Sequence, residues 1–273
     1  MPSHEMQEVT LHVGGKGWLA SDLLSGALWT LAIFFGKLSY FCWSSPGACG
    51  ILMEQLKIEF IDEMEELSEE ILEKNKPTEA DDVDWQIMHD VSRGVLGLYT
   101  TVVPAGPTVS INCWPLITHM AGFVANYQDG LRLAVCAQQA IPAHLLDPKA
   151  KTRSRMHYQM AVLQGARLGE GIWPVMLDPD GFLAEGPGWN VFLVKDGVIA
   201  TPEPRNCLLG VSRGNVLDLA GQLGIPARET NLGRYEALRA DEIFCTSTTY
   251  CICHAVSFEG QVVGNGGPGP IFQ

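Results

Sequence analysis

Positively charged side chains are scarce in this sequence. Its 273 residues include 18 Lys and Arg against 31 Asp and Glu, which gives a formal net charge of −13 at pH 7. Proteins that bind nucleic acid neutralise its phosphates with clustered Lys and Arg. The shortage of cations, together with the acidic run from Glu54 to Asp84, therefore argues against a nucleic-acid partner.

Paired cysteines and secretion signals are also missing. The eight cysteines form no C-x-x-C pair, and no basic segment precedes an apolar stretch near the N-terminus. We therefore expect free thiols in a cytoplasmic protein, because disulfides rarely persist in a reducing compartment. Cys251 and Cys253 alternate on a predicted strand, but without a second pair or a nearby His–Cys set we expect no metal site.

Long apolar runs are absent as well. The uncharged stretch from Leu23 to Gly36 covers 14 residues, fewer than the roughly 18–20 that a helix needs to cross a bilayer. We expect a buried strand pair or a core helix there, and no membrane partner. With 47% hydrophobic and 18% charged residues, the chain has enough apolar material for one large domain or two moderate ones.

The first half of the chain predicts a helix followed by strands. From Glu54 to Lys74, apolar residues recur at three- and four-residue steps, which is typical of an amphipathic helix with a solvated acidic face. Three short runs, rich in β-branched or aromatic residues and separated by Gly and Pro, then predict strands at Trp85–Val91, Thr108–Cys113 and Leu131–Gln138. We place a domain boundary at residue 125, so that 1–125 and 126–273 form two subdomains.

The second half of the chain contains clearer turn and helix-end signals. Asp-Gly pairs at Asp180–Gly181 and Asp196–Gly197 lie between apolar runs and predict two hairpins. A helix is predicted from Arg213 to a stop at Gly224. The remaining predictions are a helix at Tyr158–Leu168 and strands at Trp173–Leu177, Phe182–Glu185, Asn190–Val194, Val198–Thr201, Glu242–Thr246, Cys251–Phe258 and Gln261–Val263. These elements together predict an α+β architecture.

The second half of the chain contains few candidate catalytic residues. After Cys136 the only lysines are Lys149, Lys151 and Lys195, and the last lies in a predicted hairpin turn. Lys149 and Lys151 lie where a loop meets the next ordered element, although either one taken alone is typical of a surface lysine. Glu185 closes an apolar strand before a Gly-Pro-Gly turn. A carboxylate there is either partly buried and in need of a donor, or it caps its own turn.

Two segments have the composition of anion sites. Gly210-Val-Ser212 precedes a predicted helix, and the free N–H groups of a helix start bind phosphate without a basic side chain. Thr246-Ser-Thr-Thr249 follows a predicted strand and offers four hydroxyls. Each signal is weak by itself, because Ser and Thr are common in turns.

Several segments together resemble one enzyme family, the class IV aminotransferases, in content, order and spacing. They are Asp178–Glu185 (DPDGFLAE), Asn190–Gly197 (NVFLVKDG), Thr201–Pro202, Leu208–Arg213 (LLGVSR), Ala240–Phe244 (ADEIF) and Thr246–Thr249 (TSTT). Gly264–Pro270 (GNGGPGP) is similar to the C-terminal signature of that family, and Lys16–Asp22 (KGWLASD) resembles its first hairpin. The resemblance is specific over residues 140–273 and fainter before them.

This resemblance implies a fold-type IV enzyme that uses pyridoxal 5'-phosphate. It would have a smaller N-terminal α/β subdomain and a larger C-terminal β-barrel-like subdomain, and it would act as a homodimer. The lysine that binds the cofactor falls at Lys151, 34 residues before Glu185 as the family expects, whereas Lys149 lies two residues too far upstream. Glu185 would pair with the pyridine nitrogen. The other cofactor-binding positions implied are Leu208, Val211, Ser212, Ser247, Thr248 and Tyr158, with Tyr158 near the ring hydroxyl.

The N-terminal half departs from the family pattern. The family carries there an Arg that clamps the cofactor phosphate, but this chain has no Arg before Arg93, and its segment from Leu38 to Cys49 is a poor helix. The implied phosphate site must therefore use N–H groups and hydroxyls, or a basic residue from elsewhere. On the substrate side the resemblance points only to Arg93 and Thr249.

The function implied is transfer of an amino group between an amino acid and a 2-oxo acid. Two alternatives stay open at this stage. One is a lyase of the same fold, of the aminodeoxychorismate lyase type, which uses the same lysine and releases pyruvate without an oxo-acid acceptor. The other is a catalytically impaired relative whose altered N-terminal segment no longer closes the site. The amino donor and its stereochemistry are not defined by the sequence.

Overall fold

The computed structural model describes residues 9–12, 29–35, 60–75, 84–92, 108–152 and 155–273. By their contacts these residues fall into two compact units. The described residues up to His119, with Lys151 and Thr152, form the first, and Met120–Ala150 with Arg155–Gln273 form the second. The subdomain limits predicted at residue 125 stay a prediction.

The first unit is built on an antiparallel sheet. Among the described residues its strand order is β1-β4-β3-β2, and every neighbouring pair is antiparallel. Its elements are β1 (Val9–His12), β2 (Trp29–Phe35), α2 (Phe60–Asn75), β3 (Trp85–Ser92) and β4 (Thr108–Pro115), followed by α3 (Leu116–Met120), whose last residue belongs to the second unit. The predicted amphipathic helix is confirmed over the described part of its range, with Ile71 and Leu72 buried and the acidic residues beside them exposed.

The apolar stretch at Leu23–Gly36 contains β2, which pairs with β3 along its whole length. Of the two alternatives predicted there, a strand pair or a core helix, the described part is a strand. None of the helices within the described ranges is long and apolar enough to cross a bilayer.

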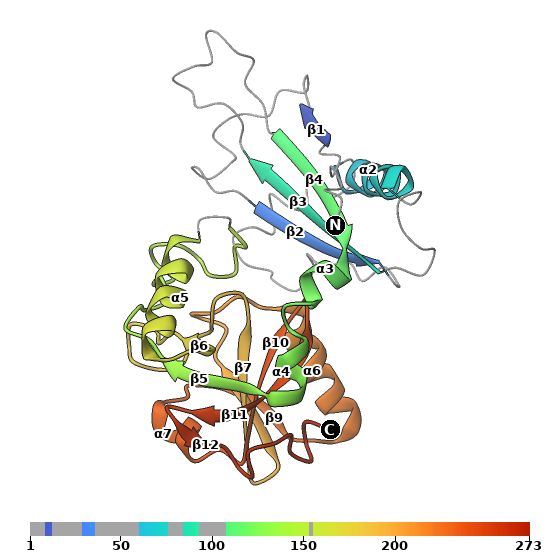
Figure 1. Ribbon diagram of the computed structural model, residues 1–273. Coiled ribbons are helices and arrows are strands. Elements are labelled where there is room, and N and C mark those ends of the chain that lie inside the picture. The colour runs from blue at the N-terminus through green and yellow to red at the C-terminus, as the bar shows by residue number, and fades with distance from the viewer. Residues whose placement is uncertain (1–8, 13–28, 36–59, 76–83, 93–107, 153–154) are drawn as a thin grey trace. The chain divides into compact units, whose positions relative to one another are not determined.

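The second unit is a mixed sheet with helices packed on it. The strand path through the described residues is β6-β5-β11-β10-β7-β8-β9, with β12 beside β11. Figure 1 shows α6 in orange along this sheet and α5 beside β5 and β6. The elements are α4 (Val124–Asp129), β5 (Leu131–Val135), α5 (Met156–Leu168), β6 (Ile172–Val175), β7 (Asn190–Lys195), β8 (Val198–Pro202), α6 (Val211–Leu223), β9 (Ala227–Thr230), α7 (Arg234–Leu238), β10 (Glu242–Ser247), β11 (Cys251–Phe258) and β12 (Gln261–Val262).

The centre of this sheet is buried on both faces, which explains the unbroken apolar run of β7. Val191 packs with Ile243 in the larger core cluster, whereas Phe192 packs with Phe244 and Ala220 of α6 on the other face. The two phenyl rings are stacked with their centroids 5.0 Å apart. Burying each of them contributes roughly 1.5–3 kcal/mol, so the middle of the sheet is a rigid support for the loops at its ends.

The hairpin predicted at Asp196–Gly197 is confirmed. β7 and β8 are antiparallel, and Lys195 pairs with Val198 across a two-residue turn. Asp196 and Gly197 have φ values of 50° and 74°. Positive φ at both central positions is the geometry that favours Asp-Gly in such turns.

The chain also reverses at Asp180–Gly181, but the strand predicted at Phe182–Glu185 is wrong. The two arms are joined by the isolated bridge between Leu177 and Leu183, and Met176 donates to the Glu185 carbonyl and accepts from the Ala184 N–H. The N–H of Phe182 donates to the Asp178 carboxylate, and that of Leu183 donates to the Leu232 carbonyl. Because Phe182 and Leu183 donate elsewhere, the pairing between the arms stays too short to form a regular strand.

The helix predicted to follow Ser212 is confirmed and begins slightly earlier, at Val211. It ends as predicted at Gly224, which has the left-handed φ of 70° and donates its N–H to the carbonyls of Ala220 and Gly221. All six cysteines within the described ranges are free, and all but Cys251 are buried.

Candidate active site

A buried carboxylate lies at the end of the reversal around Asp180–Gly181. Glu185 is only 5% exposed. The Tyr158 hydroxyl donates to its Oε1 at 2.6 Å, and the Leu208 N–H donates to its Oε2 at 2.8 Å. A carboxylate at this depth is stable only with such donors. The two bonds hold both oxygens from different elements, so the plane of the carboxylate is fixed.

The turn after Glu185 depends on a glycine. Gly186 and Trp189 exchange both backbone hydrogen bonds, at 3.0 and 3.3 Å. A Cβ added to Gly186 would lie 1.9 Å from the Trp189 ring. Any larger residue would therefore push Trp189 out of the core and move Glu185 at the same time.

A loop that follows β8 brings Leu208 to Glu185. The Leu208 carbonyl accepts hydrogen bonds from the Asn190 side-chain amide and from the Gly210 N–H, both at 2.9 Å. Asn190 is buried in the first position of β7. Its amide therefore orients the peptide group between Leu208 and Leu209, a role that was not predicted from the sequence. The available signal was its place at the head of an apolar strand, directly after a turn.

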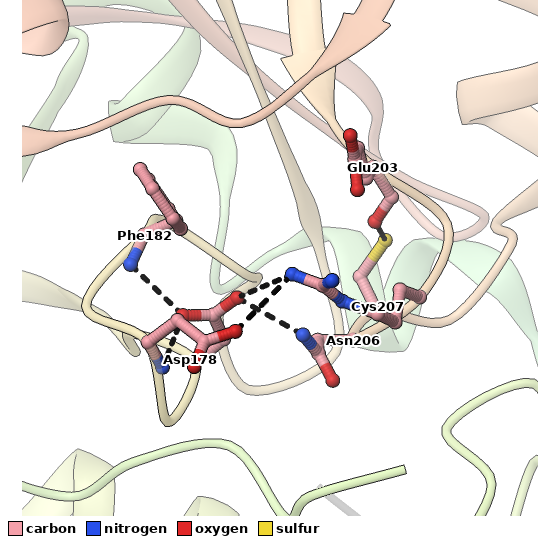
Figure 2. A network of polar contacts seen from close by, with 7 residues as sticks. Asp178, Phe182, Glu203, Asn206 and Cys207 are labelled. Carbon is pink, nitrogen blue, oxygen red and sulfur yellow. Dashed lines mark hydrogen bonds and ion pairs between the residues drawn. The ribbon is translucent and has the colours of Figure 1, made fainter.

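A second buried carboxylate ties the Glu185 reversal to the Leu208 loop (Figure 2). Asp178 is 3% exposed. Its Oδ1 accepts the N–H groups of Asp180 and Phe182, both at 2.9 Å, and its Oδ2 accepts the Asn206 side-chain amide at 2.9 Å. Arg205, half exposed, lies 3.8 Å from the same Oδ2. Asn206 is two residues before Leu208, so this network fixes the distance between Glu185 and its backbone donor.

The same loop leads into the N-terminus of α6. Gly210 is the N-cap residue, and within the described part of the chain no side chain caps the helix. The first N–H groups of a helix have no acceptor within it, and the helix dipole makes this end attractive to anions. The Ser212 hydroxyl donates to the Ser247 carbonyl at 2.9 Å. This bond joins the start of α6 to the hydroxyl-bearing turn Ser247–Thr249 at the end of β10.

The arrangement limits which groups can donate to an anion at that place. The Ser212 hydroxyl proton is used by Ser247, so the donor that Ser212 retains is its backbone N–H. Arg213 follows in the same turn, but it is 3% exposed and its guanidinium bonds to the Pro202 carbonyl and the Glu229 carboxylate at 3.0 and 2.6 Å. Arg213 therefore faces the edge of the sheet, and it does not replace the arginine missing from the first half.

Tyr158 contacts Glu185, whereas the sequence interpretation assigns it to the ring hydroxyl of a cofactor. Burial, followed by the Glu185 charge, raises the pKa of Tyr158 well above its usual range. The phenol is therefore protonated at every physiological pH and acts as a donor to the carboxylate. The Arg155 guanidinium lies 4.9 Å from the centre of its ring. The assignment to a ring hydroxyl stays a prediction.

A buried thiol lies directly before Leu208. Cys207 is 1% exposed, and burial raises its pKa to about 12, with the Glu185 charge adding to the effect. Its Sγ–H donates weakly to the Glu203 carbonyl at 3.5 Å. A thiol held in this protonated form is not a nucleophile, so Cys207 fills space behind the loop.

The two candidate lysines differ in their surroundings. The Lys149 Nζ lies 3.6 Å from the Asp147 carboxylate, which also accepts the Lys149 N–H at 3.0 Å. The Lys149 side chain is therefore ion-paired to a residue of its own loop. Lys151 is half-buried and groups with the first unit, and its role stays a prediction. Of the predicted substrate residues, Thr249 is half-buried in the turn after β10, and Arg93 lies outside the described residues.

Comparison with known proteins identifies the family. The family model for amino-transferase class IV matches residues 53–258. The branched-chain-amino-acid aminotransferase of Pseudomonas aeruginosa is 35% identical over 144 residues, which cover 53% of this chain and 47% of that protein. The enzyme of the same name from Escherichia coli K12 is 30% identical over 214 residues, covering 77% and 67%. The D-alanine aminotransferase of Bacillus licheniformis is 35% identical over 115 residues, covering 42% and 40%.

Solved structures agree in fold. A crystal structure of the Escherichia coli branched-chain amino acid aminotransferase superposes with a TM-score of 0.71 at 26% identity, covering 92% of this chain and 84% of that one. The Thermobaculum terrenum enzyme in its PLP form gives 0.71 at 22% identity, covering 90% and 80%. The predicted fold type is therefore confirmed. The chain spans about half the length of the first curated relatives it matches, but the family match extends over most of its own length. The chain belongs to the class IV amino-transferase family.

Proposed function

We propose that this protein is a transaminase that uses pyridoxal 5'-phosphate to exchange an amino group between an amino acid and a 2-oxo acid. The observation that carries the proposal is the Glu185 carboxylate, which is 5% exposed and fixed by two donors. A single loop connects its backbone donor, Leu208, to the uncapped start of α6. The carboxylate suits the pyridine nitrogen of the cofactor, and the start of α6 suits its phosphate group.

The residues present fit this cofactor. Glu185 offers an acceptor for the pyridine N–H, and the N–H groups of Val211 and Ser212 offer donors for the phosphate. Ser247 and Thr248 add hydroxyls at the neighbouring turn, and Leu208 supplies an apolar surface for the ring. When bound, the cofactor supplies an electron sink for the carbanion formed at the substrate carbon.

Each of the proposed residues would have its own role in the reaction. Lys151 holds the cofactor through its amine and, once displaced by the substrate amine, moves a proton at the substrate carbon. Glu185 keeps the ring nitrogen protonated, so that the ring accepts electrons. Lys149 is the weaker candidate because Asp147 engages it. Arg93 and Thr249 are proposed to contact the substrate carboxylate.

Branched-chain L-amino acids are the first donors to test, because the relatives from Pseudomonas aeruginosa and Escherichia coli are branched-chain-amino-acid aminotransferases, and D-alanine is the second. We also propose that the protein is a cytoplasmic homodimer. The test is spectral titration of the cofactor-loaded protein with a panel of L- and D-amino acids, with and without 2-oxoglutarate. Amino-group transfer that requires the oxo acid supports a transaminase. Pyruvate release without any acceptor would instead establish a lyase, and an unchanged spectrum with every amino acid would establish an impaired relative.

A further inference from the structure

We propose that Tyr158 is a positioning residue for the reaction, and that its phenol keeps the Glu185 carboxylate ionised and turned toward the ring nitrogen of the cofactor. This inference rests on the proposed function, since it assigns a partner to Glu185 in that role. It concerns a residue of α5, whereas the other residues assigned to the ring and its phosphate come from the segment around Glu185, the Leu208 loop with the start of α6, and the end of β10.

The geometry makes the contact a strong one. The Tyr158 Oη and Glu185 Oε1 are 2.6 Å apart, a distance typical of an O–H donor on an ionised carboxylate. The other oxygen, Oε2, is held by the Leu208 N–H at 2.8 Å. Rotation of the carboxylate would break one bond or the other. Tyr158 therefore sets the angle at which Glu185 presents itself to any third partner.

The phenol can act only as a donor here. Burial and the Glu185 charge both raise the pKa of Tyr158, so it does not lose its proton to solvent. The Arg155 guanidinium, 4.9 Å from the ring centre, opposes this shift but does not cancel it. A neutral O–H donor stabilises the charged form of its acceptor. Tyr158 consequently favours the carboxylate of Glu185 over the carboxylic acid.

This preference has a consequence for the cofactor. A proton shared between Glu185 and the pyridine nitrogen stays on the nitrogen as long as the carboxylate is well stabilised. Without the phenol, a buried carboxylate has one donor fewer, and the proton moves toward Glu185. The ring then loses its positive charge and becomes a weaker electron sink. Substrate binding does not depend on this proton, so the effect falls on kcat and not on KM.

The test compares Tyr158→Phe with Tyr127→Phe. The first substitution keeps the aromatic ring, which packs against the cluster containing Ala161 and Met176. The second removes an equally short bond of 2.6 Å in the same unit, from the Tyr127 hydroxyl to the Tyr250 backbone carbonyl. The control variant thus loses a hydrogen bond of the same length, but its tyrosine is on α4 and the acceptor is a neutral carbonyl.

The readout is the nitrogen-15 NMR shift of the ring nitrogen in holoenzyme loaded with labelled pyridoxal phosphate, measured together with kcat and KM. We expect Tyr158→Phe to move the shift toward that of unprotonated pyridine and to lower kcat on the order of ten- to a hundredfold, with KM nearly unchanged. Tyr127→Phe should leave all three values unchanged. Site-specific 3-fluorotyrosine at position 158 keeps the donor and should retain the wild-type nitrogen shift, which covers the case of a poorly folded Phe variant.

The outcomes separate this inference from the proposed function. A wild-type nitrogen shift and kcat in Tyr158→Phe would overturn the inference alone, and so would loss of the protonated signal in the fluorotyrosine protein. A Glu185→Gln holoenzyme with the same nitrogen shift as the wild-type holoenzyme would show that Glu185 is not the ring partner. That result would overturn the proposed role of Glu185 and, with it, the inference.

Discussion

Replacing Asp178 by Ala should destabilise the second unit more than any change at its exposed carboxylates. Asp178 is 3% exposed, and its carboxylate accepts three hydrogen bonds, two from backbone N–H groups and one from Asn206. A hydrogen bond to a charged group contributes about 1.5–3 kcal/mol, and a donor left unsatisfied in the interior costs about 1–3 kcal/mol. The three bonds are not additive, and the half-exposed Arg205 adds little. We expect a loss of about 3–5 kcal/mol in the free energy of unfolding.

The matched control is Asp178→Asn. Its side-chain oxygen still accepts the N–H groups of Asp180 and Phe182, and its amide donates to Asn206 once the Asn206 amide turns over. We expect this variant to lose only about 1 kcal/mol. The assay is urea unfolding at pH 7 followed by tryptophan fluorescence, to which the same unit contributes Trp189 of the core and Trp173, which is partly buried against that core. Equal midpoints for Asp178→Ala and wild type would refute the account of the network in Figure 2.

Two further predictions concern the cofactor. Glu185→Gln should keep the cofactor but lower the rate of transamination by a factor of about 10²–10³, because a neutral amide does not hold the ring nitrogen protonated. Stopped-flow measurement of the half-reactions tests this prediction, and a rate near that of the wild type would contradict it. Without an arginine clamp the purified protein should be partly apo, with affinity about ten- to a hundredfold below that of relatives that keep the clamp. Thr248→Ala should weaken binding further by removing a hydroxyl donor. Ser212→Ala should also weaken it, by releasing the Ser247 carbonyl that the hydroxyl holds. Equilibrium titration with pyridoxal phosphate after dialysis checks both variants, and stoichiometric retention by the dialysed wild-type protein would show that another cation holds the phosphate.

The elements of the second unit were predictable where local signals agree with the fold. The Asp196–Gly197 turn and the Gly224 helix stop each depend on a backbone conformation that few residues adopt, so sequence and structure coincide there. The strand predicted at Phe182–Glu185 is not formed because Phe182 donates to the Asp178 side chain and Leu183 donates to the Leu232 carbonyl, which leaves only the end of the segment to pair with its neighbour. β9 was missed because its residues are mostly exposed and show no alternation. Its strand conformation comes from parallel pairing with β8.

The candidate site was likewise predictable only in part. From its place at the end of an apolar run, Glu185 was expected either to be partly buried or to cap its own turn, and the structure shows it buried. Its donors could not be predicted in this way, because Tyr158 and Leu208 lie 27 and 23 residues away in the chain. Asn190 acts through the Leu208 carbonyl, 18 residues away. Contacts of this range depend on how the strands are ordered in the sheet, and local patterns carry no information about that order.

The central claim is that Lys151 is the lysine that binds the cofactor in a working transaminase. The most direct measurement is borohydride reduction of the cofactor-loaded protein, followed by peptide mapping with mass spectrometry, on wild type, Lys151→Ala and Lys149→Ala. We predict that the reduced cofactor is attached to Lys151 in the wild type and in Lys149→Ala, and that no lysine is labelled in Lys151→Ala, which should also lose its half-reactions. Labelling of Lys149 in the wild type, with full activity in Lys151→Ala, would contradict the account.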